Sequence, residues 1–134
     1  MGADFSMFDL AQRGMSAQLV RMNAAASNLA NAGSISSTQE GAYRPIRAVF
    51  AEELDALGGP SRVAVSHMTR EQGVATRRHE PNNPLADADG YVWISPVNET
   101  AEMVEIMESA RQYQNLVEAI QTAKQLMLET LRSE

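Results

Sequence analysis

The side chains that could do chemistry are few and widely spaced. Two histidines, His67 and His79, stand twelve residues apart, outside the usual metal-ligand spacings. The chain has no cysteine, which excludes disulfides, iron–sulfur clusters, thiolate zinc sites and cysteine nucleophiles. No Ser/His/acid set lies in a recognisable motif. The sequence therefore predicts no catalytic residue, no cofactor-binding residue, no metal ligand and no bound cofactor.

Two short segments are similar to ligand-binding loops. Asp87-Ala88-Asp89-Gly90 is similar to the start of a calcium loop, but the twelfth position holds Asn98 instead of glutamate. The favoured interpretation is a turn in which aspartate side chains cap backbone N–H groups and Gly90 takes a positive φ. Leu57-Gly58-Gly59-Pro60 lacks the spacing and the lysine of a phosphate-binding loop, so it is interpreted as a plain loop.

Composition limits the class of protein. The chain has 134 residues, the size of one domain, and its 44% hydrophobic and 21% charged residues exclude a wholly disordered chain. The net charge of −6 argues against binding to duplex nucleic acid. The longest apolar runs have four residues, as in Tyr91–Ile94, and the N-terminus shows no Sec-type signal peptide. These patterns by themselves favour a cytosolic protein without membrane insertion.

Both ends of the chain are predicted to be helical. The first helix is expected from near Ser6 to Asn31, ending before Gly33. Its apolar residues recur every seven positions, with small or polar residues between them. This stripe consists of Phe8, Met15, Met22 and Leu29, and the residues between are Ala11, Gln18 and Ala25.

The C-terminal segment gives the strongest pattern. Asn98 is a suitable N-cap, with Glu99, Glu102 and Glu105 near the positive end of the helix dipole. A 3.5-residue repeat held over four heptads favours coiled-coil packing. The stripe comprises Met103, Ile106, Ala110, Tyr113, Val117, Ile120, Lys124, Met127 and Leu131, and a weaker second stripe comprises Leu116, Ala119, Ala123 and Leu126.

All five prolines and most glycines lie between these helices. Short strands are expected over residues 43–50, 62–68, 74–78 and 91–95. The predicted fold class is α+β, with long N- and C-terminal helices pairing as a coiled-coil-like bundle and a small β-rich middle region. The expected organisation is an N-terminal helix at 1–32, a middle domain at 33–97 and a C-terminal helix at 98–134.

The helical stripes allow two interpretations. Both helices could fold back onto the β region as its core. Alternatively, they pair with each other and continue into neighbouring subunits. The even heptad period, the length of the last helix and its second stripe favour the latter, which predicts a polymer or large assembly.

Several strings resemble one known family. Ala26–Ala32 reads A-S-N-L-A-N-A, the N-terminal signature of flagellar rod and hook axial proteins. Residues 80–92 and 102–131 resemble the middle signature and the last helix of the FlgC family of proximal-rod proteins. Ser95-Pro96-Val97-Asn98 departs from the family's usual Pro-Asn-Val, and residues 33–41 are rich in serine where the family often has Asp/Gly turns.

This resemblance implies a structural subunit and no enzyme. Such subunits stack helically into the proximal rod, which crosses the periplasm and transmits torque from motor to hook. They leave the cell through the flagellar type III export apparatus without a cleaved signal, and their terminal helices fold on assembly into an inner tube. The implied partners are further copies and FlgB-, FlgF-, FlgG- and FliE-like axial proteins, with no nucleic acid. The expected assembly interface is Phe8, Met15, Met22, Leu29, Met103, Ile106, Tyr113, Val117, Ile120, Met127 and Leu131.

Three other functions stay open at this point. One is another rod subunit, FlgB-like or FlgG-like. A second is a cytosolic coiled-coil adaptor or chaperone, which accounts for the heptads but not for the signature strings. The weakest is a metal-dependent hydrolase using His79, Glu80, Asp87 and Asp89.

Overall fold

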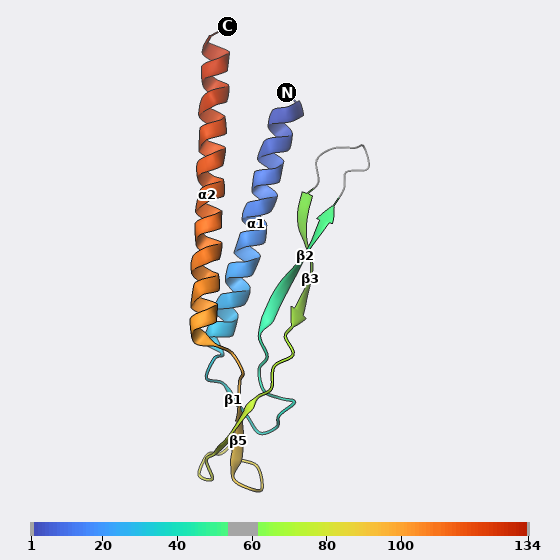
Figure 1. The fold of residues 1–134 in the computed structure, drawn as a ribbon, viewed down its shortest axis with the longest axis vertical. Helices are drawn as coiled ribbons and strands as arrows, with labels where there is room; N and C mark the ends of the chain where they lie inside the picture. Colours follow the sequence, from blue (N-terminus) through green and yellow to red (C-terminus); the bar gives the residue numbers. More distant parts are fainter. Residues whose placement is uncertain (1, 54–61, 134) are drawn as a thin grey trace.

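The computed structural model describes residues 2–53 and 62–133 (Figure 1). The expected loop at residues 57–60 lies outside the described residues. Within these residues, two helices flank five strands. Their bounds are α1 Gly2–Ala30, β1 Ile35–Ser36, β2 Ile46–Glu53, β3 Arg62–Arg70, β4 Thr76–His79, β5 Tyr91–Ile94 and α2 Glu99–Arg132.

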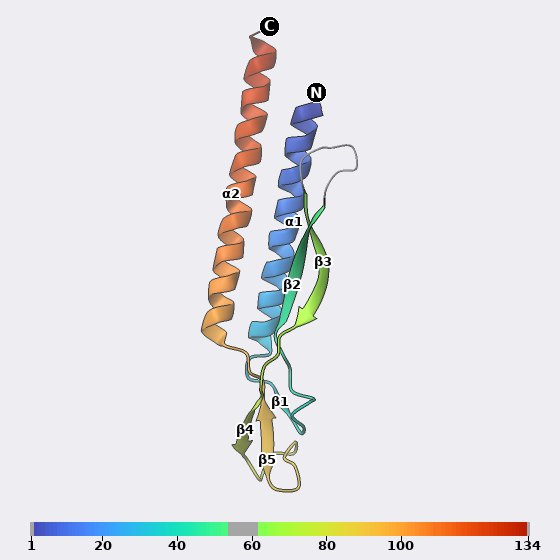
Figure 2. The same cartoon turned by 45° about the vertical axis from the view of Figure 1, so that its right-hand side comes forward.

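The molecule is elongated, and its layers run along the long axis. Helices α1 and α2 lie side by side and antiparallel, so that both chain ends reach the same end of the molecule (Figure 1). The β2–β3 hairpin packs along α1, while β1, β4 and β5 form a separate small sheet at the opposite end (Figure 2). The predicted α+β class, with paired terminal helices and a small β-rich middle, is confirmed.

The helix ends are fixed by asparagine side chains. Asn98 lies at the N-cap of α2, and its side chain accepts a hydrogen bond from the backbone N–H of Ala101 at 3.1 Å, as the sequence predicted. At the end of α1, the Asn31 amide donates to the Ser27 carbonyl at 2.8 Å, which satisfies one of the free carbonyls of the last turn.

The covered positions of α2 form a heptad stripe that differs in part from the expected one. Ile106, Tyr113, Ile120 and Met127 belong to both. Glu102 and Ser109 are buried and Leu116 and Ala123 are half-buried, whereas Met103, Ala110 and Lys124 of the expected stripe, each one residue later, are exposed. Val117 of the expected stripe is half-buried like Leu116. The side of α2 that meets α1 is therefore more polar and has smaller side chains than the pattern predicted.

The strands lie close to the predicted ones. β2 pairs antiparallel with β3, with a register shift between Val49 and Phe50, and β5 lies between β1 and β4. β2 begins at Ile46, later than expected, because Pro45 has no N–H for a ladder. Strand β1 has two residues and was not expected, since so short a strand is defined only by its pairing with β5.

The predicted turn at residues 87–90 is confirmed. The Asp87 carboxylate accepts the backbone N–H groups of Asp89 and Tyr91, each at 2.9 Å. Gly90 has φ +83°, a conformation that costs other residues free energy because Cβ approaches the following carbonyl. The Asp87 side chain thus has a structural role in holding the β4–β5 connection.

We expect Gly90→Ala to lower the free energy of unfolding by about 1–2 kcal/mol, because alanine is strained at this φ. A Cβ at this position would also lie 3.1 Å from Pro81 Cβ. The single tryptophan, Trp93, lies on β5 and reports unfolding by fluorescence. Gly33→Ala is the control, since a Cβ there meets nothing within 4 Å. Equal losses in the two variants would contradict the strain argument.

Candidate assembly surface

The predicted interface residues divide into two groups by exposure. Met103 and Leu131 are exposed, with 53% and 65% of their surface accessible. The other nine are half-buried, so they contribute to the packing of the single chain and still present atoms to solvent: Phe8, Met15, Met22, Leu29, Ile106, Tyr113, Val117, Ile120 and Met127.

An apolar patch lies near the start of α2. Met103, Val104 and Met107 are all exposed, and Met107 is 71% accessible. Spacings of three and four residues place these side chains together on one helix face. We call these three residues the α2 patch.

A second group of exposed apolar side chains lies near the C-terminal end of α2. It consists of Leu126, Leu128 and Leu131. In Figures 1 and 2 this end of α2 extends beyond the N-terminal end of α1. Leu128 and Leu131 are three residues apart and lie on one face of the helix, and exposed apolar patches mark interaction surfaces.

The two helices approach closely in the middle of α1. A Cβ at Gly14 would lie 3.1 Å from Leu116 Cδ1, so glycine leaves room for that leucine. Further along α1, Arg21 donates to the Glu105 carboxylate at 2.8 Å and to the Gln18 side chain at 2.9 Å. Small residues, the Arg21–Glu105 ion pair and the half-buried apolar residues thus hold the helix pair together.

A buried polar cluster joins three elements where the helix pair meets the start of the hairpin. Glu102, in the first turn of α2, is 1% exposed. Arg47 of β2 donates from both terminal nitrogens to the two oxygens of this carboxylate, one of them at 2.9 Å. The Asn28 amide of α1 donates to the same carboxylate at 3.3 Å. We call Asn28, Arg47 and Glu102 the clasp.

The positive charge of Arg47 in the clasp is paired with carboxylates of the same chain. Arg47 also donates from Nε to Glu71, just after β3, at 2.8 Å. Hydrogen bonds to Glu102, with a smaller contribution from Glu71, raise the pKa of Arg47 above its ordinary value despite partial burial. The guanidinium therefore stays protonated, and the buried carboxylate keeps a charged partner.

Asn28 acts as a strand partner for the start of β2. Its amide donates to the Ile46 carbonyl at 2.9 Å, and its oxygen accepts the Ile46 N–H at 2.8 Å. The same oxygen accepts the Tyr43 hydroxyl at 2.8 Å. With the bond to Glu102, all four hydrogen-bonding positions of the amide are used. Among the residues that the structure describes, every buried side-chain nitrogen and oxygen has a partner.

Sequence reasoning did not single out this cluster. Asn28 belongs to the Ala26–Ala32 string, and Glu102 was assigned only to the helix dipole. One signal was available, since Glu102 is in heptad phase with Ser109, Leu116 and Ala123. Its partner Arg47 lies 55 residues away in the chain and gives no local signal.

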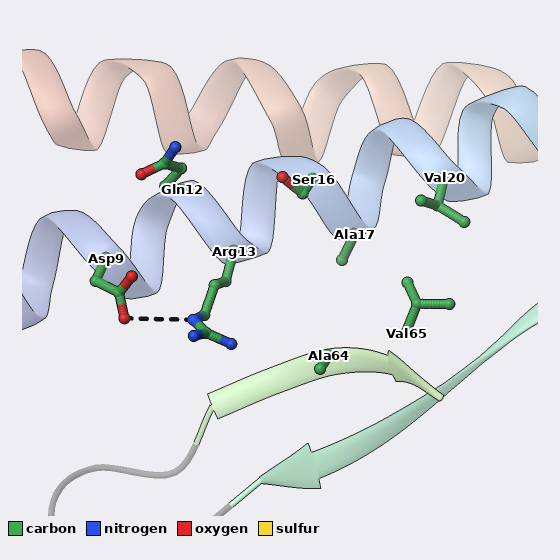
Figure 3. A pocket seen from close by; sticks show the side chains of 8 residues that line it. All are labelled: Asp9, Gln12, Arg13, Ser16, Ala17, Val20, Ala64 and Val65. Atoms are coloured by element: carbon green, nitrogen blue, oxygen red, sulfur yellow. Dashed lines mark hydrogen bonds and ion pairs between the residues drawn. The ribbon is translucent and has the colours of Figure 1, made fainter. Parts of the chain in front are cut away.

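A small groove separates α1 from β3 (Figure 3). Ala17, Val20, Ala64 and Val65 form its apolar part, and Asp9 and Arg13 form an ion pair at 3.3 Å along one side. These residues include no nucleophile–base pair that would support catalysis.

The histidines occupy exposed strand positions. His67 lies on β3 beside Ser66, whose hydroxyl is 3.1 Å from Nδ1. His79 lies on β4 against the Tyr91 ring, with ring centroids 4.8 Å apart. Arg77 and Arg78 lie on the same exposed edge strand, with the guanidinium carbon of Arg77 3.6 Å from the centroid of the Tyr91 ring. Over residues 2–53 and 62–133, no three His, Cys, Asp or Glu residues come together in a way that could hold a metal ion.

Comparison with known families defines the class of protein. Residues 8–32 match the family model described as flagella basal body rod protein, and residues 88–133 match that of the flagellar basal body rod FlgEFG protein C-terminal region. These ranges contain most of α1 and the whole of α2. The chain is a structural subunit of the flagellar basal-body rod and not an enzyme. In the described part of the chain, neither helix combines the length and apolar character needed to cross a bilayer.

Curated relatives narrow the class to one family. The chain is 41% identical over 128 residues to the flagellar basal-body rod protein FlgC of Salmonella typhimurium, with 94% of each chain covered. It is 40% identical to those of Escherichia coli O6:H1 and Yersinia enterocolitica, again with 94% of each chain covered. The chain belongs to the FlgC family of flagellar basal-body rod proteins.

Proposed function

We propose that this chain is a subunit of the proximal rod, stacking helically through its terminal helices to transmit torque from motor to hook. The single observation that carries the proposal is the similarity to FlgC proteins over nearly the whole chain. The exposed apolar side chains of α2 support it, because a helix that already packs on α1 keeps further apolar surface for other subunits.

The three parts of the chain have separate roles in this proposal. The helices at 1–32 and 98–134 form the inner tube, and the β-rich region at 33–97 forms the outer layer. The half-buried stripe residues hold α1 to α2, while Met103 and Leu131 contact neighbouring subunits. Many equivalent interfaces then share the torque, so that no single contact carries it.

The proposed location and partners are those that the resemblance to the family implies. The chain is exported by the flagellar type III apparatus without a cleaved signal and is assembled in the periplasm. Its neighbours are further copies and FlgB-, FlgF-, FlgG- and FliE-like axial proteins, without nucleic acid or membrane insertion. The net charge of −6 supports the exclusion of nucleic acid.

The direct experiment is mass spectrometry of purified flagellar basal bodies from the source cell. We expect peptides from this chain, enriched together with hook and rod proteins. Clean basal bodies that lack the chain, with the protein abundant in the cytosol, would refute the rod function and favour a cytosolic coiled-coil adaptor.

A substitution in the α2 patch separates assembly from folding. We expect Met107→Asp to change the free energy of unfolding by no more than about 0.5 kcal/mol, because the side chain is already exposed. Incorporation into basal bodies should fall sharply, because the new carboxylate would lose water against a neighbouring helix.

The control for this variant is Gln112→Asp, which places the same side chain at an exposed polar position of α2. Incorporation is measured by quantitative mass spectrometry of basal bodies, and swimming is measured in soft agar. Normal incorporation of the Met107 variant would contradict a role for the α2 patch in subunit contacts.

A further inference from the structure

The clasp has an unusual position for a charged group. Glu102 is almost fully buried, yet it lies where α1, β2 and α2 meet. Its partners Asn28 and Arg47 lie 74 and 55 positions earlier in the chain. The clasp therefore ties together three elements that the chain connects only through long segments.

A buried ion pair is a weak source of stability, because both charges lose their hydration and the attraction between them restores only part of that loss. Well-packed apolar side chains of similar volume often serve a fold equally well. Apolar side chains do not, however, fix the angle at which two elements meet. A guanidinium that meets a carboxylate through two nitrogens fixes the plane and the angle of the contact.

The Asn28 contacts extend this directional control to the backbone. The amide holds both backbone polar groups of Ile46, the residue immediately before Arg47, at 2.8 and 2.9 Å. Arg47 itself contacts α2 through Glu102 and the end of β3 through Glu71. The start of the hairpin is thus held against α1 and α2 at once.

An angular error at this point would be amplified along the molecule. With 34 residues and a rise of 1.5 Å each, α2 is about 51 Å long, so a tilt of about 10° at its N-terminal end would move its far end by about 9 Å. Such a displacement is as large as the 8–10 Å that separates packed helices. A subunit that must fit identical neighbours needs this angle fixed.

We propose that Asn28, Arg47 and Glu102 are positioning residues that set the angle between the helix pair and the β2–β3 hairpin, and that their role is subunit geometry for assembly instead of stability. This inference rests on the proposed rod function, because the geometry matters only if the subunit is built into a repeating structure. The clasp itself acts within one chain and can be measured without a rod.

The test replaces the ion pair by apolar side chains of similar length. The double variant Arg47→Met with Glu102→Met removes both charges, and Glu102→Met alone leaves the guanidinium without its buried partner. Arg78→Met with Glu108→Met makes the same changes at exposed positions and is the matched control.

Geometry is measured by pulsed electron paramagnetic resonance. Ser66→Cys on β3 and Gln114→Cys on α2 place spin labels at exposed positions of a chain that otherwise has no cysteine. In the double variant we expect a thermal unfolding midpoint within about 4 °C of the wild type. The distance distribution should be clearly broader, and incorporation into basal bodies should fall at least about tenfold. The single variant should show a lower midpoint than the double one.

Three results would overturn the proposal. The first is a double variant with a narrow distribution and normal incorporation. The second is a midpoint that falls in step with incorporation, which would make the clasp only a source of stability. The third is a wild-type distribution as broad as that of the variant. Absence of the wild-type chain from basal bodies would instead refute the rod function, and the comparison of distances would still decide the role of the clasp.

Discussion

Replacing Asn28 by aspartate is expected to unfold the junction between the helix pair and the hairpin. The amide donates to the Ile46 carbonyl and to Glu102, and aspartate has no N–H to replace either bond. The variant would also place a second carboxylate beside the buried Glu102. Because an uncompensated buried charge costs about 3–5 kcal/mol, the loss should be a large part of the total stability of a domain, which is about 5–15 kcal/mol.

The measurement is urea unfolding followed by circular dichroism, together with swimming of a strain that carries only the variant. Asn23→Asp is the control, because Asn23 is exposed on the same helix. The control should change stability by less than about 0.5 kcal/mol and swim normally. A stable, motile Asn28→Asp strain would show that the Asn28 contacts have little energetic weight.

Ile120→Asp is expected to abolish rod assembly while leaving expression intact. Ile120 is half-buried on α2, one turn after Leu116, whose side chain lies 3.1 Å from where a Cβ at Gly14 of α1 would be. Burying an isoleucine side chain fully contributes about 1.5–3 kcal/mol, and aspartate both loses this contribution and places a charge between the helices. The helix pair should therefore separate at its centre, and the strain should not swim.

Immunoblotting of whole cells measures expression, and soft-agar swimming measures function. Gln121→Asp is the matched control, since it introduces the same side chain at the adjacent exposed position. Reduced swimming in both variants to the same degree would mean that added charge on α2, and not loss of the stripe, causes the defect. Normal swimming of the Ile120 variant would count against pairing through this stripe.

Local sequence was sufficient for most of the secondary structure. The heptad spacing predicted α2, and Asn98 marked its start, because capping and periodicity depend on residues within a few positions of each other. The turn at Asp87–Gly90 was equally local. The Ala26–Ala32 string and the two later signature stretches were sufficient to indicate the family.

The sequence could not decide which side of α2 meets α1. Ile106, Tyr113, Ile120 and Met127 serve two adjacent stripes, and the apolar residues on one side made that stripe the more hydrophobic of the two. The structure buries Glu102 and Ser109 on the other side, and it leaves Val117 of the predicted stripe half-buried. The hydrophobic pattern favoured the stripe with Met103, Ala110 and Val117, because hydrophobicity alone takes no account of the charged partner of a side chain. A carboxylate can be buried only where a cation meets it.

Taken by itself, the sequence determined the α+β class, the two long helices, the β4–β5 turn and the flagellar rod family. Each of these depends on short-range spacing or on strings of neighbouring residues. Only the tertiary structure decided that Asn28, Arg47 and Glu102 form one cluster, and which apolar residues of α2 stay exposed. The physical reason is that the burial of Glu102 depends on Arg47, 55 residues away, and on the close approach of α1. A pattern of neighbouring residues cannot indicate a contact between residues that lie so far apart in the sequence.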